Sequence, residues 1–213
     1  MRRTSLRTTT APGGVPISLS YPEIPLHAFL ENTARKYPDR TAAIFYSNRI
    51  QYSRLWDESL RLAGALRGLG LEKGGRVAML LPNVPQFIIA FNGILAAGGV
   101  AVPINPLNPV EEVARELNET GAESLIALDR LLDKVPEGNP GNLIVAEAAA
   151  YVPWHLRTLS RLRGGKRSPE GSLSFEELLK GQRLDGLIRI APEKDLAAIL
   201  YTSGTTGPPA IPA

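Results

Sequence analysis

The chain has 213 residues, of which 44% are hydrophobic and 21% are charged, so it is long enough to bury a sizeable core. It has no cysteine and two histidines far apart in sequence, which excludes disulfides, thiolate metal sites and a cysteine nucleophile and disfavours a histidine-based metal centre. The net charge of +3 arises from two segments without acidic residues, 1–10 and 151–167, which together hold eight of the 24 basic residues. The rest of the chain has sixteen basic and 21 acidic residues and is therefore acidic. Such local basicity argues against a nucleic-acid-binding surface.

Residues 1–22 are polar and contain proline and glycine, so we expect a disordered N-terminal arm. Its arginine- and threonine-rich, acid-poor composition also resembles a transit peptide, but it lacks the apolar core of a secretory signal. No apolar stretch reaches the roughly 18–20 residues of a membrane-spanning helix. These features predict a cytoplasmic protein.

A helical pattern begins at Pro25 and ends at Pro38. His27 falls off the apolar stripe of this helix, so we expect it to face solvent. The residues at three- and four-residue spacing are predicted to form the buried face: Leu26, Phe29, Leu30, Thr33, Ala34 and Tyr37.

Strands and helices then alternate along the chain. Strands are expected, in chain order, at 41–46, 49–53, 76–81, 100–104, 124–128, 143–146 and 196–200. The first two form a hairpin that turns at 47–48. Helices are expected at 53–70, 87–97, 109–120 and 174–180, the first three capped by Ser53, Asn83 and Asn108. This alternation predicts an α/β fold, with a layered, mostly parallel sheet, flanking helices and right-handed crossovers.

Residues 151–167 interrupt the alternation with a short basic amphipathic segment. Trp154 and three leucines lie among arginines there. The segment is either an interfacial helix that touches anionic lipid or an apolar substrate, or a surface insertion whose basic face is solvated.

The strongest functional signal follows the apolar run 196–200. A loop rich in glycine and hydroxyl groups can turn its N–H groups toward one point and wrap a polyphosphate. The candidate binding residues are Thr202, Ser203, Gly204, Thr205, Thr206 and Gly207.

Two well-known glycine-rich nucleotide-binding motifs, the Walker A motif and the dinucleotide fingerprint, are not present. The loop is not a Walker A motif, because no Gly-Lys-Ser/Thr follows Gly204 at the required spacing. The glycines at 68–74 follow a helix and precede a strand, the reverse of a dinucleotide fingerprint, and are interpreted as a helix end and turn.

The loop sequence Tyr201-Thr-Ser-Gly-Thr-Thr-Gly207 resembles the phosphate-binding motif of the adenylate-forming enzymes, the superfamily of acyl-CoA synthetases, luciferases and peptide-synthetase adenylation domains. The stretch from Ile94 to Pro106 is similar to the helix-to-strand motif upstream of that loop. Asn105-Pro-Leu-Asn-Pro109 and Leu117-Asn-Glu-Thr-Gly-Ala122 resemble the fatty acyl-CoA ligase branch. The likeness covers residues 22–207, nearly the whole chain.

This resemblance implies the N-terminal part of the large domain of an adenylate-forming enzyme, with a partial AMP-binding domain at 23–207 and a tail outside the family pattern at 208–213. It implies that fatty acid and Mg-ATP form acyl-adenylate and pyrophosphate, after which coenzyme A displaces AMP. The role implied for the loop is to hold the β- and γ-phosphates.

The chain departs from the family pattern after the loop. Ala210 stands where the family carries a lysine, and the residues that would bind ribose, adenine and magnesium lie downstream of position 213, so no residue is assigned as catalytic or as a metal ligand. Three hypotheses stay open: a truncated acyl-CoA synthetase fragment that is inactive alone; a non-catalytic module that pairs with a separate C-terminal half; and a peripheral protein at the inner membrane surface that binds through 151–167.

Overall fold

The structure, a computed structural model, describes residues 21–138, 141–153, 155 and 168–201. Its helices are α1 (Ala28–Lys36), α2 (Tyr52–Gly68), α3 (Pro85–Ala96), α4 (Val110–Thr120) and α6 (Phe175–Leu178), with a 3-10 helix η1 (Asp129–Lys134). Its strands are β1 (Thr41–Phe45), β2 (Asn48–Gln51), β3 (Arg76–Leu80), β4 (Val100–Pro103), β5 (Ser124–Leu128), β6 (Asn142–Ala146) and β7 (Leu173–Ser174).

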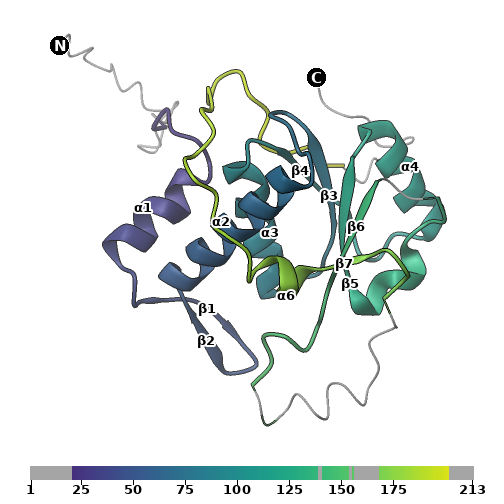
Figure 1. The fold of residues 1–213 in the computed structure, drawn as a ribbon, viewed down its shortest axis with the longest axis horizontal. Coiled ribbons are helices and arrows are strands. Elements are labelled where there is room, and N and C mark those ends of the chain that lie inside the picture. The colour runs from purple at the N-terminus through teal and green to yellow at the C-terminus, as the bar shows by residue number, and fades with distance from the viewer. Residues whose placement is uncertain (1–20, 139–140, 154, 156–167, 202–213) are drawn as a thin grey trace, which may run out of the picture.

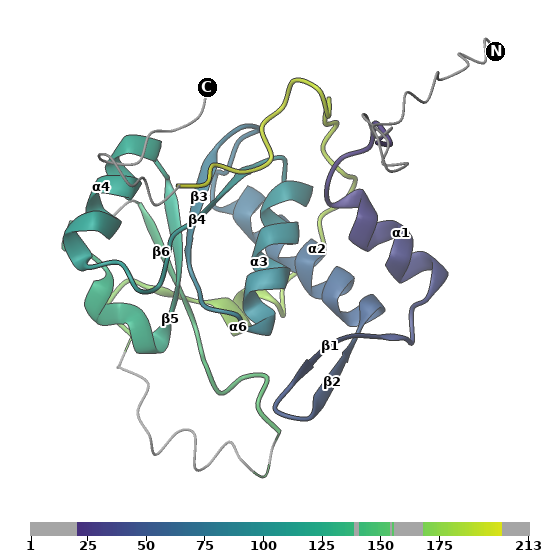
Figure 2. The same cartoon turned by 180° about the vertical axis from the view of Figure 1, so that it is seen from behind.

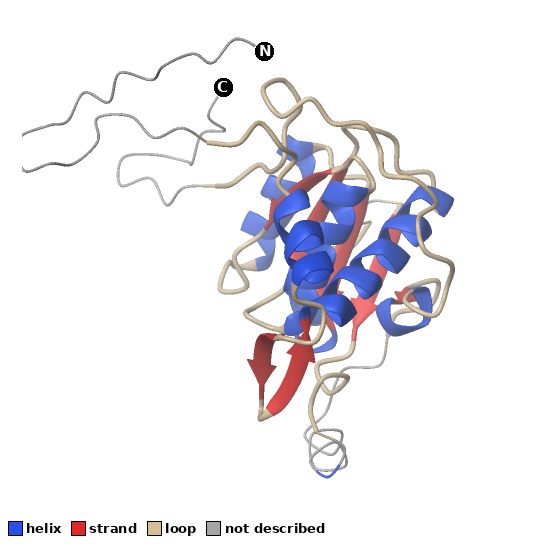
Figure 3. Cartoon of the chain, turned by 90° about the vertical axis from the view of Figure 1, so that its left-hand side faces the viewer, coloured by secondary structure: helices blue, strands red, loops and turns tan. Residues whose placement is uncertain are grey.

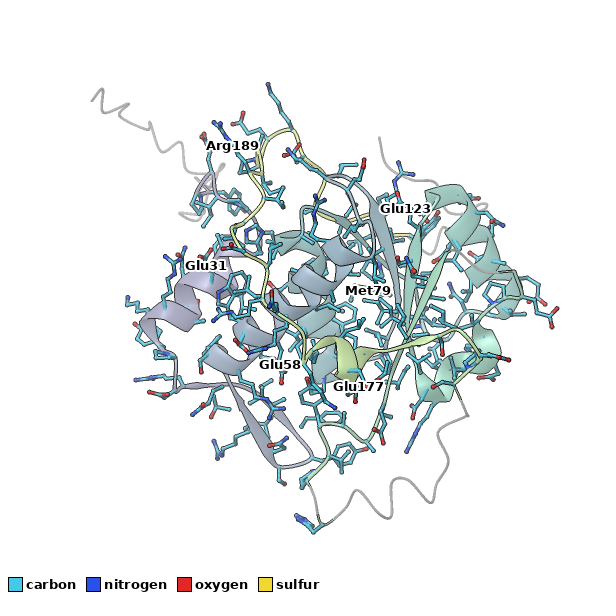
Figure 4. All side chains as sticks on the ribbon, viewed as in Figure 1. Glu31, Glu58, Met79, Glu123, Glu177 and Arg189 are labelled. Carbon is cyan, nitrogen blue, oxygen red and sulfur yellow. The ribbon has the colours of Figure 1, made fainter. Side chains whose placement is uncertain are left out.

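The centre of the fold is a five-stranded sheet in the order β4-β3-β5-β6-β7, with every neighbouring pair parallel. Side chains of β3 alternate between two hydrophobic clusters, Val77 and Met79 on one face and Ala78 and Leu80 on the other. Met79 is labelled in Figure 4. Helices α2 and α3 cover the first face and α4 the second (Figures 1 and 2). The layered α/β architecture predicted from the alternation is therefore confirmed.

An additional short stretch extends the sheet beyond β4. Ala198 pairs with Ala101 in parallel, and the backbone N–H of Ile199 donates to the carbonyl of Ala101 at 2.9 Å. The N–H of Ala101 in turn donates to the carbonyl of Ala197 at 3.0 Å. Because the pairing is parallel, residues 200 and 201 leave the sheet at the same edge as the carboxyl end of β4.

The hairpin β1–β2 stands apart from the main sheet (Figure 3). Its turn is one residue earlier than predicted, since Tyr46 (φ 46°) and Ser47 (φ 67°) are the two residues in the left-handed region. A two-residue turn of this kind matches the twist of the strands it joins. The amide of Asn48 donates to the carbonyl of Tyr151 at 3.0 Å, which ties the hairpin to the segment after β6.

The predicted buried face of α1 is correct for Ala34, which is buried, and for Leu30, which packs against the core, but it is wrong for Leu26 and Phe29, and the expectation that His27 faces solvent is wrong. Leu26 and Phe29 are 47% and 51% exposed, whereas His27 is buried and its ring stacks on that of Trp56 at 6.2 Å. Helix α1 is rotated so that His27 and Ala34 face α2. An apolar stripe in the sequence does not by itself determine which face of a helix its neighbour covers. Here the buried face of α1 is the one whose His27 ring stacks on Trp56 of α2.

The predicted side-chain caps are also wrong. The residues at the cap positions of α2, α3 and α4 are Gln51, Val84 and Pro109, and none makes a side-chain capping bond. The side chain of Asn108 is engaged elsewhere, since its amide donates to Glu116.

Candidate functional site

The order of the strands creates a crevice at the carboxyl ends of β3 and β4. The chain leaves β3 into α3 on one face and leaves β4 into α4 on the other face, because β4 and β5 flank β3 on opposite sides. Where consecutive connections diverge in this way, the loops separate and leave room for a ligand. This edge of the sheet is therefore the candidate ligand site.

A cavity of about 450 Å³ occupies this crevice. The loop after β3 and the loop after β4 form two of its walls, α4 forms a third, and the end of the added strand closes it. The lining residues are Leu81, Pro82, Asn83, Phe87, Pro103, Ile104, Asn105, Pro106, Asn108, Glu112, Glu116, Leu200 and Tyr201. None of these described lining residues is basic, and two are acidic.

Glu116 is the most buried ionisable group of the cavity, with 2% of its surface exposed. One carboxylate oxygen accepts a hydrogen bond from the Asn108 amide at 2.9 Å, while Oε2 has no hydrogen-bond partner among the described residues. Burial raises the pKa of Glu116, and the neighbouring charge of Glu112 acts in the same direction. The described lining of this cavity thus offers a phosphate group two carboxyl groups and no basic side chain.

A charged row on α4 contacts the end of the added strand. The Tyr201 hydroxyl donates to Glu119 Oε2 at 3.1 Å, and the Arg115 guanidinium lies over the Tyr201 ring at 5.6 Å. Arg115 also binds Glu119 Oε1 at 2.7 Å and forms a two-point contact with Glu112. Burial and the bond to Glu119 raise the pKa of Tyr201 to about 12, and the Arg115 contact lowers the pKa of Glu112.

The predicted phosphate-binding residues, Thr202, Ser203, Gly204, Thr205, Thr206 and Gly207, lie outside the described residues. The structure describes their point of departure, Tyr201, at the carboxyl edge of the sheet. Sequence reasoning missed Arg115, Glu116 and Glu119 as neighbours of that point. The three- and four-residue spacing of charges from Glu112 to Glu119 was a signal for ion pairs along one helix face, but not for a contact with residue 201.

A second polar cluster, away from the crevice, joins α2 to residues 150–151 and to α6, next to a cavity of about 280 Å³. The Tyr151 hydroxyl donates to Glu58 at 2.7 Å, and Arg54 lies over the Tyr151 ring at 5.2 Å. Glu176 accepts a hydrogen bond from the Glu147 N–H at 3.0 Å, and burial raises the pKa of Glu176 to about 7. This cluster joins α2 and α6 to the segment that follows β6. Like Tyr201, Tyr151 donates its hydroxyl to a glutamate and has an arginine over its ring.

The part of the chain that the structure describes holds no group of three or more histidine, aspartate or glutamate residues placed to bind a metal ion. None of its helices is long and apolar enough to cross a membrane. Of the basic segment 151–167, only 151–153 and His155 are described, and Tyr151 and Val152 are buried.

These features define a doubly wound α/β protein whose ligand crevice lies at the carboxyl edge of the sheet. The family model of the AMP-binding enzymes matches residues 30–210. The chain therefore belongs to the AMP-binding enzyme family, which confirms the resemblance to adenylate-forming enzymes.

Curated relatives agree with this assignment. The chain is 31% identical over 210 residues to a long-chain-fatty-acid–CoA ligase of Bacillus subtilis, an alignment that covers 93% of this chain and 38% of the relative. It is 31% identical to a protein of the same name from Salmonella typhimurium, with 83% of this chain and 34% of the relative covered. The chain thus spans about a third of the length of these relatives.

Solved structures share the fold. A long-chain-fatty-acid–CoA ligase from Archaeoglobus fulgidus superimposes with a TM-score of 0.71 at 22% identity, covering 91% of this chain and 37% of that one. A benzoate CoA ligase from Burkholderia xenovorans gives a TM-score of 0.67 at 25% identity, with 84% and 32% covered. The fold is therefore that of the N-terminal part of adenylate-forming enzymes.

Proposed function

We propose that this chain is the phosphate-binding N-terminal part of a fatty acyl-CoA synthetase. In that reaction a fatty acid carboxylate attacks the α-phosphate of Mg-ATP, pyrophosphate leaves, and coenzyme A converts the acyl-adenylate to the thioester. The observation that carries the proposal is the parallel pairing of Ala198 with Ala101. It brings Tyr201 to the carboxyl edge of the sheet, at the crevice, immediately before the predicted phosphate loop.

The loop is the part of the chain whose chemistry fits a polyphosphate. Its six residues, Thr202, Ser203, Gly204, Thr205, Thr206 and Gly207, offer backbone N–H groups and four hydroxyls, which stabilise negative charge on a leaving pyrophosphate. The acidic cavity around Glu116 does not fit phosphate. We therefore assign the phosphates to the loop, and the cavity to uncharged or donor-bearing parts of the bound molecules.

We expect the isolated chain to bind polyphosphate weakly and to be inactive in adenylation. It spans about a third of its relatives and offers no described metal cluster. In our proposal the AMP-binding region covers residues 23–207, between an N-terminal arm (1–22) and a separate tail (208–213). Membrane contact through 151–167 stays a prediction, because most of that segment lies outside the described residues.

A second candidate function is a module that pairs with a separate C-terminal half. The added strand favours it, because Leu196 and Leu200 are 64% and 58% exposed beside a strand whose outer edge is not paired within the described residues. Exposed apolar side chains at a free sheet edge are suited to cover by further polypeptide.

Two measurements test the main proposal. Calorimetric titration with sodium tripolyphosphate should show binding with a dissociation constant of about 1 mM. This value corresponds to a standard binding free energy of roughly −4 kcal/mol. The variant Gly204→Val, which restricts the backbone of the loop, should abolish it. Fatty-acid-dependent exchange of pyrophosphate into ATP should be undetectable. Equal binding by the Gly204→Val variant contradicts the assignment of the loop, and measurable exchange contradicts the expected inactivity.

A further inference from the structure

We propose that the cavity at the carboxyl ends of β3 and β4 binds a molecule that carries a primary ammonium group on an apolar body, and that Glu116 of α4 holds the ammonium group. The fatty acid, ATP and coenzyme A of the proposed reaction carry no ammonium group, so this site goes beyond the proposed function. The described lining of the cavity is sufficient to carry the inference.

The buried carboxyl group of Glu116 is only half satisfied by the protein. Glu116 is 2% exposed, and one of its oxygens accepts a hydrogen bond from the Asn108 amide at 2.9 Å. Its other oxygen, Oε2, is also buried and has no hydrogen-bond partner among the described residues. A buried carboxyl group without its full set of donors is costly. A donor that enters the cavity and reaches this oxygen therefore gains a hydrogen bond that the described protein does not supply.

The charges on α4 favour a cation as this donor. Arg115 is engaged with two other carboxylates, Glu119 at 2.7 Å and Glu112 through a two-point contact. Glu116 is thus left without a basic partner among the described residues that line the cavity. Burial raises the pKa of Glu116, the charge of Glu112 acts in the same direction, and an ammonium group beside the carboxyl group would favour its ionised form.

Other side-chain oxygens of the cavity complete the match to an ammonium group. Such a group has three N–H donors and no acceptor, so it needs several oxygens around it. Asn83, Asn105 and Asn108 line the cavity together with Glu116. The Asn105 oxygen accepts the N–H of Leu107 at 3.0 Å, and an amide oxygen has a second lone pair. The polar part of the cavity is therefore rich in acceptors.

The remaining lining is apolar and sets the second requirement on the ligand. Leu81, Phe87, Ile104 and Leu200 contribute apolar surface to a cavity of about 450 Å³. Sites for small molecules typically have volumes of about 300–1,000 Å³ and combine an apolar lining with few polar groups. The cavity thus suits a compact apolar body with a single ammonium group better than a small inorganic cation.

Helix α4 fixes the position of Glu116 while its carboxyl group can turn. The helix is anchored on the sheet by Val113, which is fully buried, and by Leu117, which is 5% exposed. The last torsion of a glutamate side chain is soft. Its partner Asn108 lies in the loop that lines the same cavity. A small rotation of the carboxyl group can therefore present an oxygen to the ligand without movement of the helix.

The first test compares three probes of similar size on the full wild-type chain. Phenethylammonium is the cation, phenethyl alcohol is its neutral counterpart, and hydrocinnamate is the anion. In calorimetric or ligand-observed magnetic resonance titrations the ammonium probe should bind at least tenfold more tightly than the alcohol, the effect of a hydrogen bond to a charged group. The anion should not bind. Intermolecular nuclear Overhauser contacts should place the ring of the ammonium probe beside Phe87 and Ile104.

The second test uses two matched variants on the same helix. Glu116→Gln removes the charge but keeps an oxygen for the Asn108 amide, and it should weaken binding of the ammonium probe about tenfold while binding of the alcohol changes less than twofold. Glu119→Gln is the control, because Glu119 is not among the lining residues and its side chain is 39% exposed. It should bind both probes within twofold of the wild type. Thermal melting checks that each variant is folded.

Each contrary result overturns the inference. The cavity is not an ammonium site if the wild-type chain binds the alcohol as tightly as the ammonium probe, binds neither, or shows Overhauser contacts elsewhere. These results need no variant, so they decide the matter even where Glu116→Gln does not fold. Equal binding by a folded Glu116→Gln variant, or an equal loss in Glu119→Gln, removes the role of Glu116. Failure to bind tripolyphosphate would contradict the proposed function alone.

Discussion

The contact between α2 and α3 offers the sharpest test of the fold, through the substitution Gly93→Ala. Gly93 lies in α3 where that helix crosses α2. A Cβ atom added there would lie 2.9 Å from the carbonyl oxygen of Ser59 and 3.1 Å from a methyl group of Leu62. Ser59 and Leu62 are fully buried, so neither can turn away toward solvent.

The expected magnitude follows from these distances. Ordinary contacts of a Cβ begin at about 3.4 Å, so α2 would have to withdraw by about 0.5 Å along the length of its contact with α3. Such overpacking typically costs about 1–3 kcal/mol. Replacing glycine by alanine inside a helix contributes about 1 kcal/mol in the other direction. We therefore expect the free energy of unfolding to fall by up to about 2 kcal/mol. Each kcal/mol corresponds to roughly 2–4 °C in melting temperature for a chain of this length.

The assay is urea unfolding followed by far-ultraviolet circular dichroism, with Gly68→Ala as the control. Gly68 is the last residue of α2, and an added Cβ there meets no atom within 4 Å. That variant should be neutral or stabilised by up to about 1 kcal/mol. If Gly93→Ala is as stable as Gly68→Ala, the two helices do not approach as closely as described and the reasoning is refuted.

Three further predictions concern buried groups. Burial raises the pKa of Glu176 to about 7, so the folded protein keeps this proton to a higher pH than the unfolded chain does. The free energy of unfolding should therefore fall by about 2 kcal/mol between pH 5 and 8. In urea unfolding, Glu176→Gln should not show this fall. Burial lowers the pKa of His27, so stability should also decline as the pH drops below 6.5, and thermal melts of His27→Phe should not show this decline. Leu62→Ala removes a fully buried side chain and should lose about 2–5 kcal/mol in urea unfolding, whereas Leu107→Ala, at an 85% exposed position, should change nothing measurable.

The sequence by itself determined the elements and their class. Strand and helix periodicity is a local property, so the alternation from residue 76 to 146 predicted the parallel sheet, and the glycine-threonine loop identified the family. The apolar character of the α3 region likewise predicted its burial, and in the structure eight of its twelve residues are buried and the other four are half-buried.

Only the tertiary structure decided which surfaces meet. The face of α1 that is buried depends on Trp56, which is 29 positions further along the chain than His27. The contact of Tyr201 with Glu119 joins residues 82 positions apart, and it exists because Ala198 pairs with Ala101. Contacts over such distances depend on strand order and helix rotation, which leave no periodic trace in the sequence. The loop motif was thus visible in the sequence, whereas the contact of α4 with Tyr201 was not.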